Sequence, residues 1–351
     1  MKRHPLIRAG ACAAAIVVAA CAETTAPLPP PEEVLLVVNS TEASLSIVPT
    51  DNPNAGTTVP LGGTTPTPVS VAALNDIALV PMGLDNSVVV VDLRTRQVLR
   101  TIGLPSGSGA TGAAIIDDSI AYVANPNLNT VTRVNYLTGD TASVAVGVYP
   151  DGVVFTRGRV FVLNANLVQF APAGPSWITV IDPLTNLPAT GIDSIGLPGP
   201  GNAGFAAVGA DGLLYVVSSG DFFSGEGRLS IVDPVGRQEV GNFGGFGTGP
   251  GSLAADAGER LFISSFAEGL MEFNTRTRAV VIGAGNGVAV PGNSSVAVDG
   301  QGRIYAISTG PCQGGQGGVA HVLRSDLTES RTIGLGECAI YATVVSIPPG
   351  S

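Results

Sequence analysis

Short apolar runs recur along the chain, several of them centred on an aromatic residue, and polar turns rich in glycine and aspartate separate them. The runs are Ile77-Ala78-Leu79-Val80, Ile120-Ala121-Tyr122-Val123, Val160-Phe161-Val162, Leu214-Tyr215-Val216, Leu261-Phe262-Ile263 and Ile304-Tyr305-Ala306. They are short and dominated by β-branched and aromatic residues, as β-strands are, and long apolar helical faces are absent from the sequence. The pattern therefore predicts an all-β chain of short strands joined by tight turns.

Each apolar run belongs to a larger repeat with a strand of small residues before it and two further strands after it. The third strand of each repeat ends in an acid or amide, at Asp92, Asn135, Asp182, Asp233, Asn274 and Asp326. Successive repeats are spaced by about 40 to 55 residues, which is the period of propeller blades. The sequence predicts six complete four-stranded blades that begin near Val69, Thr111, Asp151, Ala203, Ser252 and Ser294.

Two fragments outside these repeats complete a seventh blade. Residues 34–38, 43–48 and 57–61 have the pattern of three strands, and residues 339–347 have that of the missing first strand. Joining them closes the ring, so that no sheet face is left unpacked at either end. We therefore expect one domain over residues 34–351, a seven-bladed β-propeller whose seventh blade is closed by N-terminal strands and the C-terminal strand.

Several repeats resemble known propeller motifs. Residues 242–251 with Arg260-Leu261-Phe262-Ile263, and residues 297–305, resemble NHL repeats, while Ala121-Tyr122-Val123-Ala124-Asn125 with Asn129-Thr130-Val131 and Thr138-Gly139-Asp140 resembles a YVTN repeat. The resemblance spans residues 34–347 and extends to the gluconolactonase group of propellers. It implies the fold but says little about the chemistry.

The recurring acids and amides at strand ends have a structural interpretation. Asp182-Pro183-Leu184-Thr185 and Asp233-Pro234-Val235-Gly236 are turn sequences in which an Asx side chain accepts backbone N–H groups. Asp256 and Asp299 begin turns between first and second strands in the same way. We expect these residues to cap turns rather than to form a ligand ring.

The N-terminal residues resemble a bacterial lipoprotein leader. Lys2, Arg3 and Arg8 precede an apolar stretch that is too short to span a bilayer, and Val18-Ala19-Ala20-Cys21 resembles a lipobox. This predicts a signal peptide over residues 1–20, a lipid on Cys21, and a proline-rich tether over residues 21–33. An ordinary secretory leader is the alternative. Because Ala22 follows the cysteine, the resemblance implies a cell-envelope protein anchored in the outer membrane, provided that the host has two membranes.

Charge and cysteine content narrow the possible partners and the compartment. The net charge is −10, the only lysine is Lys2, and the arginines of the body form no cluster. We therefore expect no nucleic-acid partner, because neutralising phosphates needs clustered cations. Cys312 and Cys338 are the only cysteines of the body, and export predicts a disulfide between them, with two free buried thiols as the alternative.

The loops that join second to third strands, and those that join blades, lie on one face of a propeller. Three of them are long here, at residues 164–176, 218–227 and 308–318, and two of these carry Phe170, Phe222 and Phe223. Long loops with aromatic residues favour recognition, so this face is the candidate binding face. The alternative is that each aromatic packs beneath its own loop.

Residues suited to catalysis are few. His321 is the body's only histidine, and its position within a strand favours a packed or surface role over a catalytic triad. Resemblance to the gluconolactonase group implies one enzymatic alternative, a hydrolase, lactonase or lyase with Ca²⁺ at the axis, for which Asp151, Asn202 and Asn293 are the candidate metal ligands. The preferred hypothesis is a non-catalytic binding or scaffold propeller without a cofactor. It would be tethered to the membrane by its lipid alone and would bind a protein, peptide or glycan.

Overall fold

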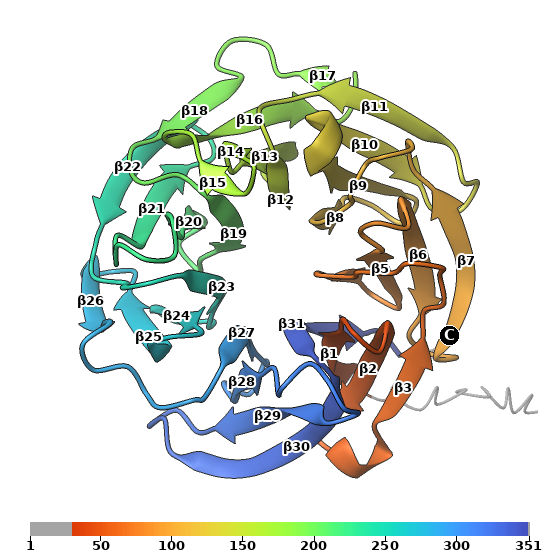
Figure 1. The fold of residues 1–351 in the computed structure, drawn as a ribbon, viewed down its shortest axis with the longest axis vertical. Coiled ribbons are helices and arrows are strands. Elements are labelled where there is room, and N and C mark those ends of the chain that lie inside the picture. Colours follow the sequence, from red (N-terminus) through yellow and green to blue (C-terminus); the bar gives the residue numbers. More distant parts are fainter. Residues whose placement is uncertain (1–29, 350–351) are drawn as a thin grey trace, which may run out of the picture.

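The computed structural model describes residues 30–349, which form seven β-sheets arranged radially around a central axis (Figure 1). The expected signal peptide, Cys21 and the tether up to residue 29 lie outside the described residues. Within residues 30–349, no helix is long and apolar enough to cross a membrane. The seven radial sheets are the blades of the seven-bladed β-propeller that the repeat predicts (Figure 1).

In each blade the first strand lies nearest the axis, and the apolar second strand pairs with it on its outer side (Figure 1). The first strands are β31 (Ala339–Ile347), β4 (Ala72–Leu74), β8 (Ala113–Ile115), β12 (Pro150–Thr156), β19 (Ala203–Val208), β23 (Pro250–Ala255) and β27 (Asn293–Val298). The second strands are β1 (Glu32–Asn39), β5 (Ile77–Pro81), β9 (Ile120–Asn125), β13 (Arg159–Asn164), β20 (Leu214–Ser218), β24 (Arg260–Ser265) and β28 (Ile304–Ser308).

The outer half of each blade contains the third and fourth strands. The third strands are β2 (Ser44–Pro49), β6 (Ser87–Asp92), β10 (Thr130–Asn135), β16 (Ser176–Asp182), β21 (Arg228–Asp233), β25 (Gly269–Asn274) and β29 (Gly317–Leu323). The fourth strands are β3 (Thr57–Pro60), β7 (Gln97–Gly103), β11 (Thr141–Ala145), β17 (Leu187–Pro188) with β18 (Ser194–Leu197), β22 (Gln238–Phe243), β26 (Ala279–Ile282) and β30 (Glu329–Glu337). A small hairpin of β14 (Leu167–Val168) and β15 (Ala171–Pro172) and two short 3₁₀ turns, η1 (Pro53–Ala55) and η2 (Pro126–Leu128), complete the fold.

The seventh blade joins the two ends of the chain, as expected. Its strand order is β3-β2-β1-β31, and β1 pairs antiparallel with β31 from Glu32↔Ile347 to Asn39↔Ala339. β1 begins at Glu32, two residues before the expected Val34, so the last residues assigned to the tether belong to the sheet.

The unbroken apolar run of β1 follows from burial on both faces of its sheet. Leu36 belongs to the core cluster shared with the β4–β7 blade, whereas Leu35 and Val37 belong to the cluster shared with Tyr305 of the β27–β30 blade. Successive side chains of a strand point to opposite faces, so both neighbouring blades pack on the closing sheet. The core is therefore a series of interfaces between adjacent blades.

The turn-capping role of the repeated acids is confirmed, with one correction of position. The Asp92 carboxylate accepts the main-chain N–H groups of Arg94 and Thr95, at 2.8 and 2.9 Å. Asp326 does not end its strand, because β29 already ends at Leu323. It lies in the following turn, where its carboxylate accepts the Thr328 N–H at 3.0 Å.

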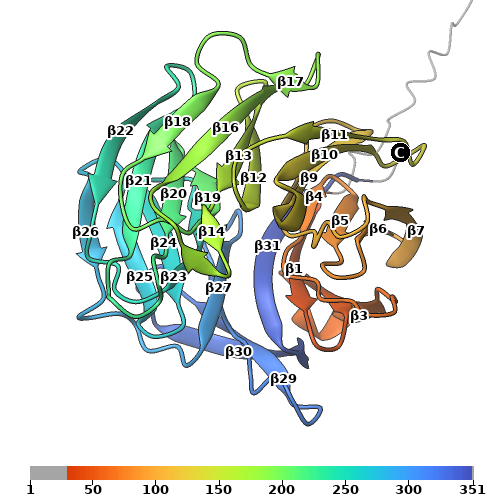
Figure 2. The same ribbon diagram turned by 45° about the horizontal axis from the view of Figure 1, so that its top comes forward.

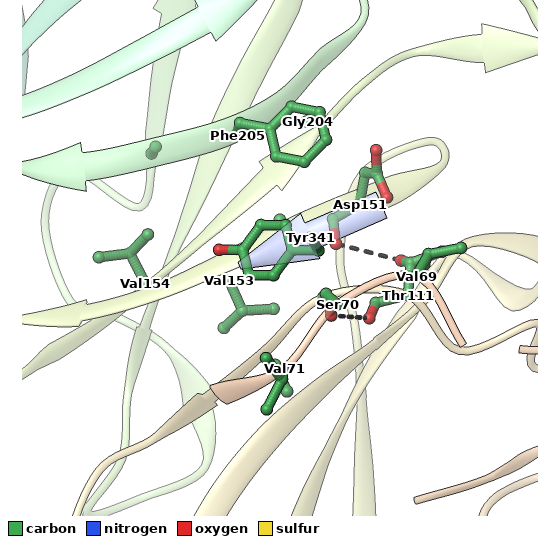
Figure 3. Close-up of a pocket in the computed structure, with 14 residues that line it drawn as sticks. Val69, Ser70, Val71, Thr111, Asp151, Val153, Val154, Gly204, Phe205 and Tyr341 are labelled. Carbon is green, nitrogen blue, oxygen red and sulfur yellow. Dashed lines mark hydrogen bonds between the residues drawn. The ribbon is translucent and has the colours of Figure 1, made fainter. Parts of the chain in front are cut away.

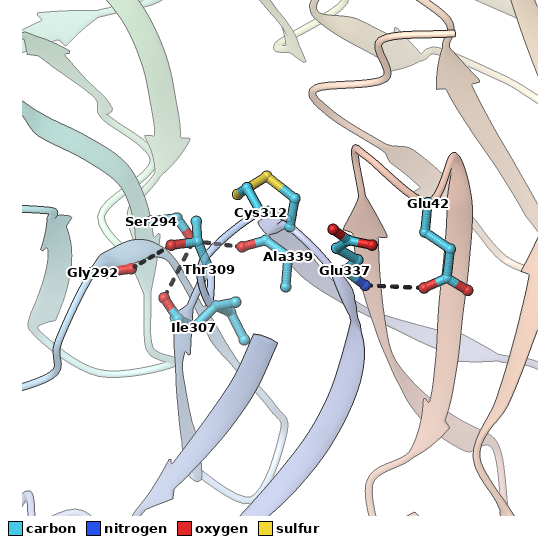
Figure 4. Close-up of a disulfide and its surroundings, with 9 residues drawn as sticks. Glu42, Gly292, Ser294, Ile307, Thr309, Cys312, Glu337 and Ala339 are labelled. Carbon is cyan, nitrogen blue, oxygen red and sulfur yellow. Dashed lines mark hydrogen bonds between the residues drawn. A yellow bond between two sulfur atoms is a disulfide. The ribbon is translucent and has the colours of Figure 1, made fainter. Parts of the chain in front are cut away.

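The predicted disulfide lies at the seam where the ring closes (Figure 4). Cys312 is in the loop between β28 and β29, and Cys338 separates β30 from β31. Beside it, the Ser294 hydroxyl donates to the Ala339 carbonyl at 2.9 Å, and the Glu337 N–H donates to the Glu42 carboxylate at 2.9 Å. The bond therefore attaches the last complete blade to the strand that closes the ring.

Replacing both cysteines, Cys312→Ser with Cys338→Ser, should lower the free energy of unfolding by about 3–4 kcal/mol. The bond closes a loop with a sequence separation of 26, and the open variant regains that loop's chain entropy when unfolded. Urea denaturation without reductant measures the change. Reductant should bring the wild type to the stability of the variant and leave the variant unchanged; equal stability of the two proteins without reductant would contradict the prediction.

Candidate functional site

One face of the propeller, called here the loop face, contains the connections between second and third strands and those between blades. The former are residues 40–43, 82–86, 126–129, 165–175, 219–227, 266–268 and 309–316, and the latter are residues 61–71, 104–112, 146–149, 198–202, 244–249, 283–292 and 338. The opposite face, called the hairpin face, contains the tight turns between first and second and between third and fourth strands. The chain enters the propeller from the hairpin face, because β1 is a second strand and runs toward the loop face.

Exposed apolar side chains lie on the loop face in five consecutive blades. They are Leu84, Leu128, Val168, Phe170, Phe222, Phe223 and Phe266, and together they are called the apolar rim. Each lies in a connection between a second and a third strand, so they occupy corresponding places around the axis. Apolar residues grouped on one face of a soluble domain mark an interaction surface more often than scattered ones do.

The three expected aromatic residues differ in how far they pack on their own loops. Phe170 is 78% exposed although its ring contacts Tyr149 edge-on, with the centroids 6.1 Å apart. Phe222 is half exposed and lies against Gly249 of the next connection. Phe223 is 89% exposed. All three remain accessible, and sequence reasoning missed their neighbours Leu84, Leu128 and Phe266.

The charge on the two faces differs. The loop face carries Glu42, Asp85, Asp221, Glu226 and Glu268, and among its described connections there is no lysine, arginine or histidine. The turns of the hairpin face also carry acids, but these are accompanied by Arg94, Arg96, Arg157, Arg237, Arg276, Arg278, Arg303 and Arg324. A cationic partner therefore meets acids and no repelling cation in the described connections of the loop face.

A pocket of about 250 Å³ lies on the axis of the ring (Figure 3). Its walls come from the first strands of several blades and are mostly valine, alanine and glycine. Phe205 of β19 and Tyr341 of β31 stack within it at 6.2 Å between ring centroids, with 17° between their planes. Asp151 is the only charged residue in its lining.

Strand pairing shows how Asp151 comes to the axis. Asp151 lies two residues before Val153, the residue that pairs with Val162 of β13. The corresponding residues of the other blades are Val69, Thr111, Gly204, Gly251, Ser294 and Ile340. Asp151 is therefore the one ionisable side chain in a ring of otherwise uncharged residues.

Hydrogen bonds connect the neighbouring first strands at this level. The Ser70 hydroxyl donates to the Thr111 carbonyl at 2.6 Å, and the Thr111 hydroxyl donates to the main-chain carbonyl of Asp151 at 3.1 Å (Figure 3). On the other side, a Cβ at Gly204 would stand only 2.6 Å from the carboxylate of Asp151. Glycine at 204 therefore leaves the space that this carboxylate occupies.

The Asp151 side chain is half-buried in the pocket and has no charged partner among the described residues. Within residues 30–349, no arginine or histidine forms a salt bridge with it. Burial raises the pKa of this carboxyl to about 6. Burial also raises the pKa of the Tyr341 phenol, so Tyr341 stays neutral at physiological pH.

The two asparagines expected beside Asp151 occupy other positions of the repeat. Asn202 lies four residues before Ala206, and Asn293 lies three residues before Val296, whereas Asp151 lies two before the corresponding Val153. Neither asparagine lines the axial pocket. No cluster of three or more His, Cys, Asp or Glu residues suited to a metal occurs in the part of the chain that the structure describes.

The side-chain amides of these two asparagines do not face the axial pocket, where ligands of a metal would lie. The Asn202 Nδ2 donates to the Gly220 carbonyl at 3.1 Å and so fixes a connection on the loop face. Asn293 is 1% exposed, and neither atom of its side-chain amide has a hydrogen-bond partner among residues 30–349. The structure therefore brings only Asp151, of the three candidate ligands, to the axial pocket.

His321 bridges three strands of one blade. Its Nδ1 lies 2.6 Å from Glu329 Oε2 and its Nε2 lies 3.1 Å from Ser308 Oγ. This resembles the order of a Ser-His-acid triad, but the Ser308 hydroxyl donates to the Pro291 carbonyl at 2.6 Å. Because the Ser308 proton is directed to that carbonyl, Ser308 does not donate to Nε2, and the arrangement links strands instead of activating the serine.

Comparisons with known proteins bear on the architecture. The sequence matches no protein-family model, and no curated protein matches it. Among solved structures, a chain of hydrazine synthase from Kuenenia stuttgartiensis superposes with a TM-score of 0.63 at 16% identity, covering 88% of this chain and 99% of that one. A functionally unknown protein from Desulfotomaculum acetoxidans DSM 771 superposes with a TM-score of 0.66 at 13% identity, covering 90% and 99%. These likenesses establish the fold alone.

Replacing Asp151 by the isosteric amide, Asp151→Asn, should stabilise the protein at pH 7 by up to about 3 kcal/mol and leave it unchanged near pH 3.5. In the wild type the folded state holds this proton up to pH about 6 and the unfolded state loses it near pH 3.8, so the wild type loses stability between these values as pH rises. Urea denaturation across this range measures the difference.

Asp221→Asn is the matched control with the opposite sign. Hydrogen bonds from the Ser224 hydroxyl and from the Phe223 and Ser224 N–H groups lower the pKa of the Asp221 carboxyl to about 2. Its stabilising effect is therefore present above pH 3.8 and is lost as pH falls toward 2, and the amide should destabilise at pH 7. An Asp151→Asn variant that is no more stable than wild type at pH 7 would contradict a desolvated carboxylate.

Proposed function

We propose that this chain is an envelope-anchored lipoprotein whose propeller binds a protein partner through the loop face, without catalysing a reaction. The observation that carries this proposal is the apolar rim, which presents Phe170, Phe223, Phe266 and their neighbours to solvent on five consecutive blades. Exposed aromatic anchors on loops held by a rigid sheet scaffold are the usual basis of protein recognition.

The direction of the chain supports an outward-facing loop face. The described chain enters at the hairpin face through β1, which lies beside β31 (Figure 2). A tether from Cys21 would continue from that face. At roughly 3 Å per residue, a proline-rich tether of this length spans a few tens of Å. Anchoring from the hairpin face leaves the apolar rim accessible to a partner rather than pressed against the protein's own membrane.

Lipid anchoring is tested by replacing the proposed attachment residue, Cys21→Ser. The variant should incorporate no labelled palmitate and should leave the membrane fraction, because a single serine cannot hold the acyl chains. Metabolic labelling followed by membrane fractionation measures both effects. Cys12→Ser is the control and should behave as wild type; membrane retention of Cys21→Ser would contradict the anchor.

Partner binding is tested by placing a photo-crosslinker, p-benzoylphenylalanine, in the protein's own cells at Phe223 or Phe266. Both positions should yield an adduct with one and the same protein, identified by mass spectrometry. Leu184 and Val235 are matched controls, since they are 91% and 72% exposed but lie in turns of the hairpin face. The same adduct at the control positions, or none at the rim, would contradict the proposal.

Loss of contact area gives the second readout. In the protein that carries the crosslinker at Phe223, the further substitutions Phe170→Ser and Phe222→Ser should reduce the yield of adduct on the order of tenfold or more. The reason is that truncating an aromatic anchor costs about 1 kcal/mol or more of binding free energy. Leu184→Ser with Val235→Ser should leave the yield unchanged. An undiminished adduct in the rim variant would mean that these side chains do not contribute to binding.

A further inference from the structure

The axial pocket has an acid at the end nearest the partner-binding face. Asp151 is the second residue of β12, and first strands begin at the loop face, so its carboxylate lies near that end of the pocket. Phe205 and Tyr341 each lie one register position deeper, where Gly152 stands in β12. A group entering from the loop face would therefore meet the acid first and the aromatic pair next.

We propose that this pocket receives a lysine or arginine side chain of the protein bound at the loop face, with its cationic group at Asp151. The inference rests on the proposed function, because the side chain belongs to the partner that the apolar rim engages. The recognised chemistry is a protonated amine or guanidinium on an apolar stem. Nothing covalent changes on binding.

The first argument is that the acid lacks a cation of its own. The other acids of the loop face with hydrogen bonds cap backbone groups, as Asp85 does for Thr64 and Thr65 and Glu268 does for Thr248. Asp151 has no ion-pair partner in residues 30–349, and the described loop-face connections contain no cationic side chain to supply one. A cation from outside would be the first to pair with it.

The second argument is that an aromatic pair lies just beyond the acid along the path of entry. Val69, Val71, Val153 and Val154 line the pocket around the stacked rings of Phe205 and Tyr341 (Figure 3). A cation at Asp151 therefore lies beside aromatic rings, which attract it, while its methylene stem extends back toward the partner on the loop face. The volume of about 250 Å³ is below that of sites for drug-sized molecules, so it suits a side chain.

The third argument is that the same walls do not suit a hard metal ion. Calcium takes six to eight oxygen ligands, about 2.4 Å away. The pocket offers one carboxylate, and its hydroxyls on Ser70 and Thr111 already donate to main-chain carbonyls. An organic cation needs only the charge of Asp151 and apolar contact.

The test measures binding of n-butylammonium to the full-length protein by saturation-transfer NMR, with n-butanol as the neutral probe and CaCl₂ as the metal probe. Wild type should bind the cation on the order of ten- to a hundredfold more tightly than the alcohol, and Asp151→Asn should remove that preference. Asp221→Asn should leave it intact. Equal binding of both probes to wild type, or a preference that survives Asp151→Asn, would overturn the inference. Stoichiometric Ca²⁺ that displaces n-butylammonium would overturn it in favour of an axial metal site.

A second variant keeps the test independent of local folding at Asp151. Phe205→Leu leaves the carboxylate in place and removes one aromatic wall, and it should weaken n-butylammonium several-fold while leaving unfolding by urea cooperative. Unchanged cation affinity in Phe205→Leu would contradict the proposed contact between the cation and the aromatic pair.

The crosslinking assay at Phe223 separates this inference from the proposed function. If Asp151→Asn reduces the Phe223 adduct, the cation comes from the partner as proposed. An undiminished adduct beside lost n-butylammonium binding means that the pocket serves a free amine, which overturns the inference but not the proposed function. Loss of crosslinking specificity at the rim would remove the proposed function even if the pocket binds the probe.

Discussion

Closure of the ring by β1 and β31 is the constraint on which the rest of the molecule depends. Propeller blades pack only against their neighbours, so an open ring would expose two apolar sheet faces. Here Leu35 and Leu36, adjacent in one strand, contribute to the cores on opposite sides of the closing sheet. The seam is further held by the disulfide on the loop face and by Asp51, which pairs with Arg303 at 2.9 Å on the hairpin face.

A closed ring fixes the register of the first strands, and that register determines what lies on the axis. Phe205 and Tyr341 meet because they occupy corresponding positions in strands from nearly opposite sides of the ring (Figure 1). Asp151 faces Gly204 for the same reason. The pocket is therefore a consequence of closure, and the two faces can differ freely. The hairpin face uses Asx turns and arginine pairs to hold strands together, while the described connections of the loop face carry acids without arginine and the exposed phenylalanines.

The fold could be predicted from the sequence because each blade is marked by patterns of residues that are close together in the chain. Paired apolar runs and Asx turns such as Asp182-Pro183 mark every blade, and the closing strand was visible because residues 339–347 complete the partial N-terminal blade. Phe170, Phe222 and Phe223 were identifiable from the length of their loops. Leu84, Leu128 and Phe266 were missed because a single apolar residue in a short loop carries no signal until the loops are superposed in space.

The candidate site could be predicted only in part, because it depends on register. First strands contain irregularities in pairing, between Pro150 and Val153 and between Asn293 and Ser295, and these shift a residue's position by one without any mark in the sequence. Asp151, Asn202 and Asn293 therefore looked alike as polar residues at blade starts, although only the first reaches the pocket. The aromatic pair was invisible because its members are far apart in the sequence and share only their place in the repeat.

The most direct test is the pKa of the Asp151 carboxyl, measured by ¹³C NMR in the full-length protein and assigned with Asp151→Asn. The account predicts a value of about 6 in the free protein, because the group is desolvated and has no cationic partner. Saturation with n-butylammonium should lower that value, since a neighbouring cation favours the ionised form. A pKa near 3.8 in the free protein, or a pKa that the cation leaves unchanged, would contradict an axial pocket in which Asp151 lacks a cationic partner and binds one from outside.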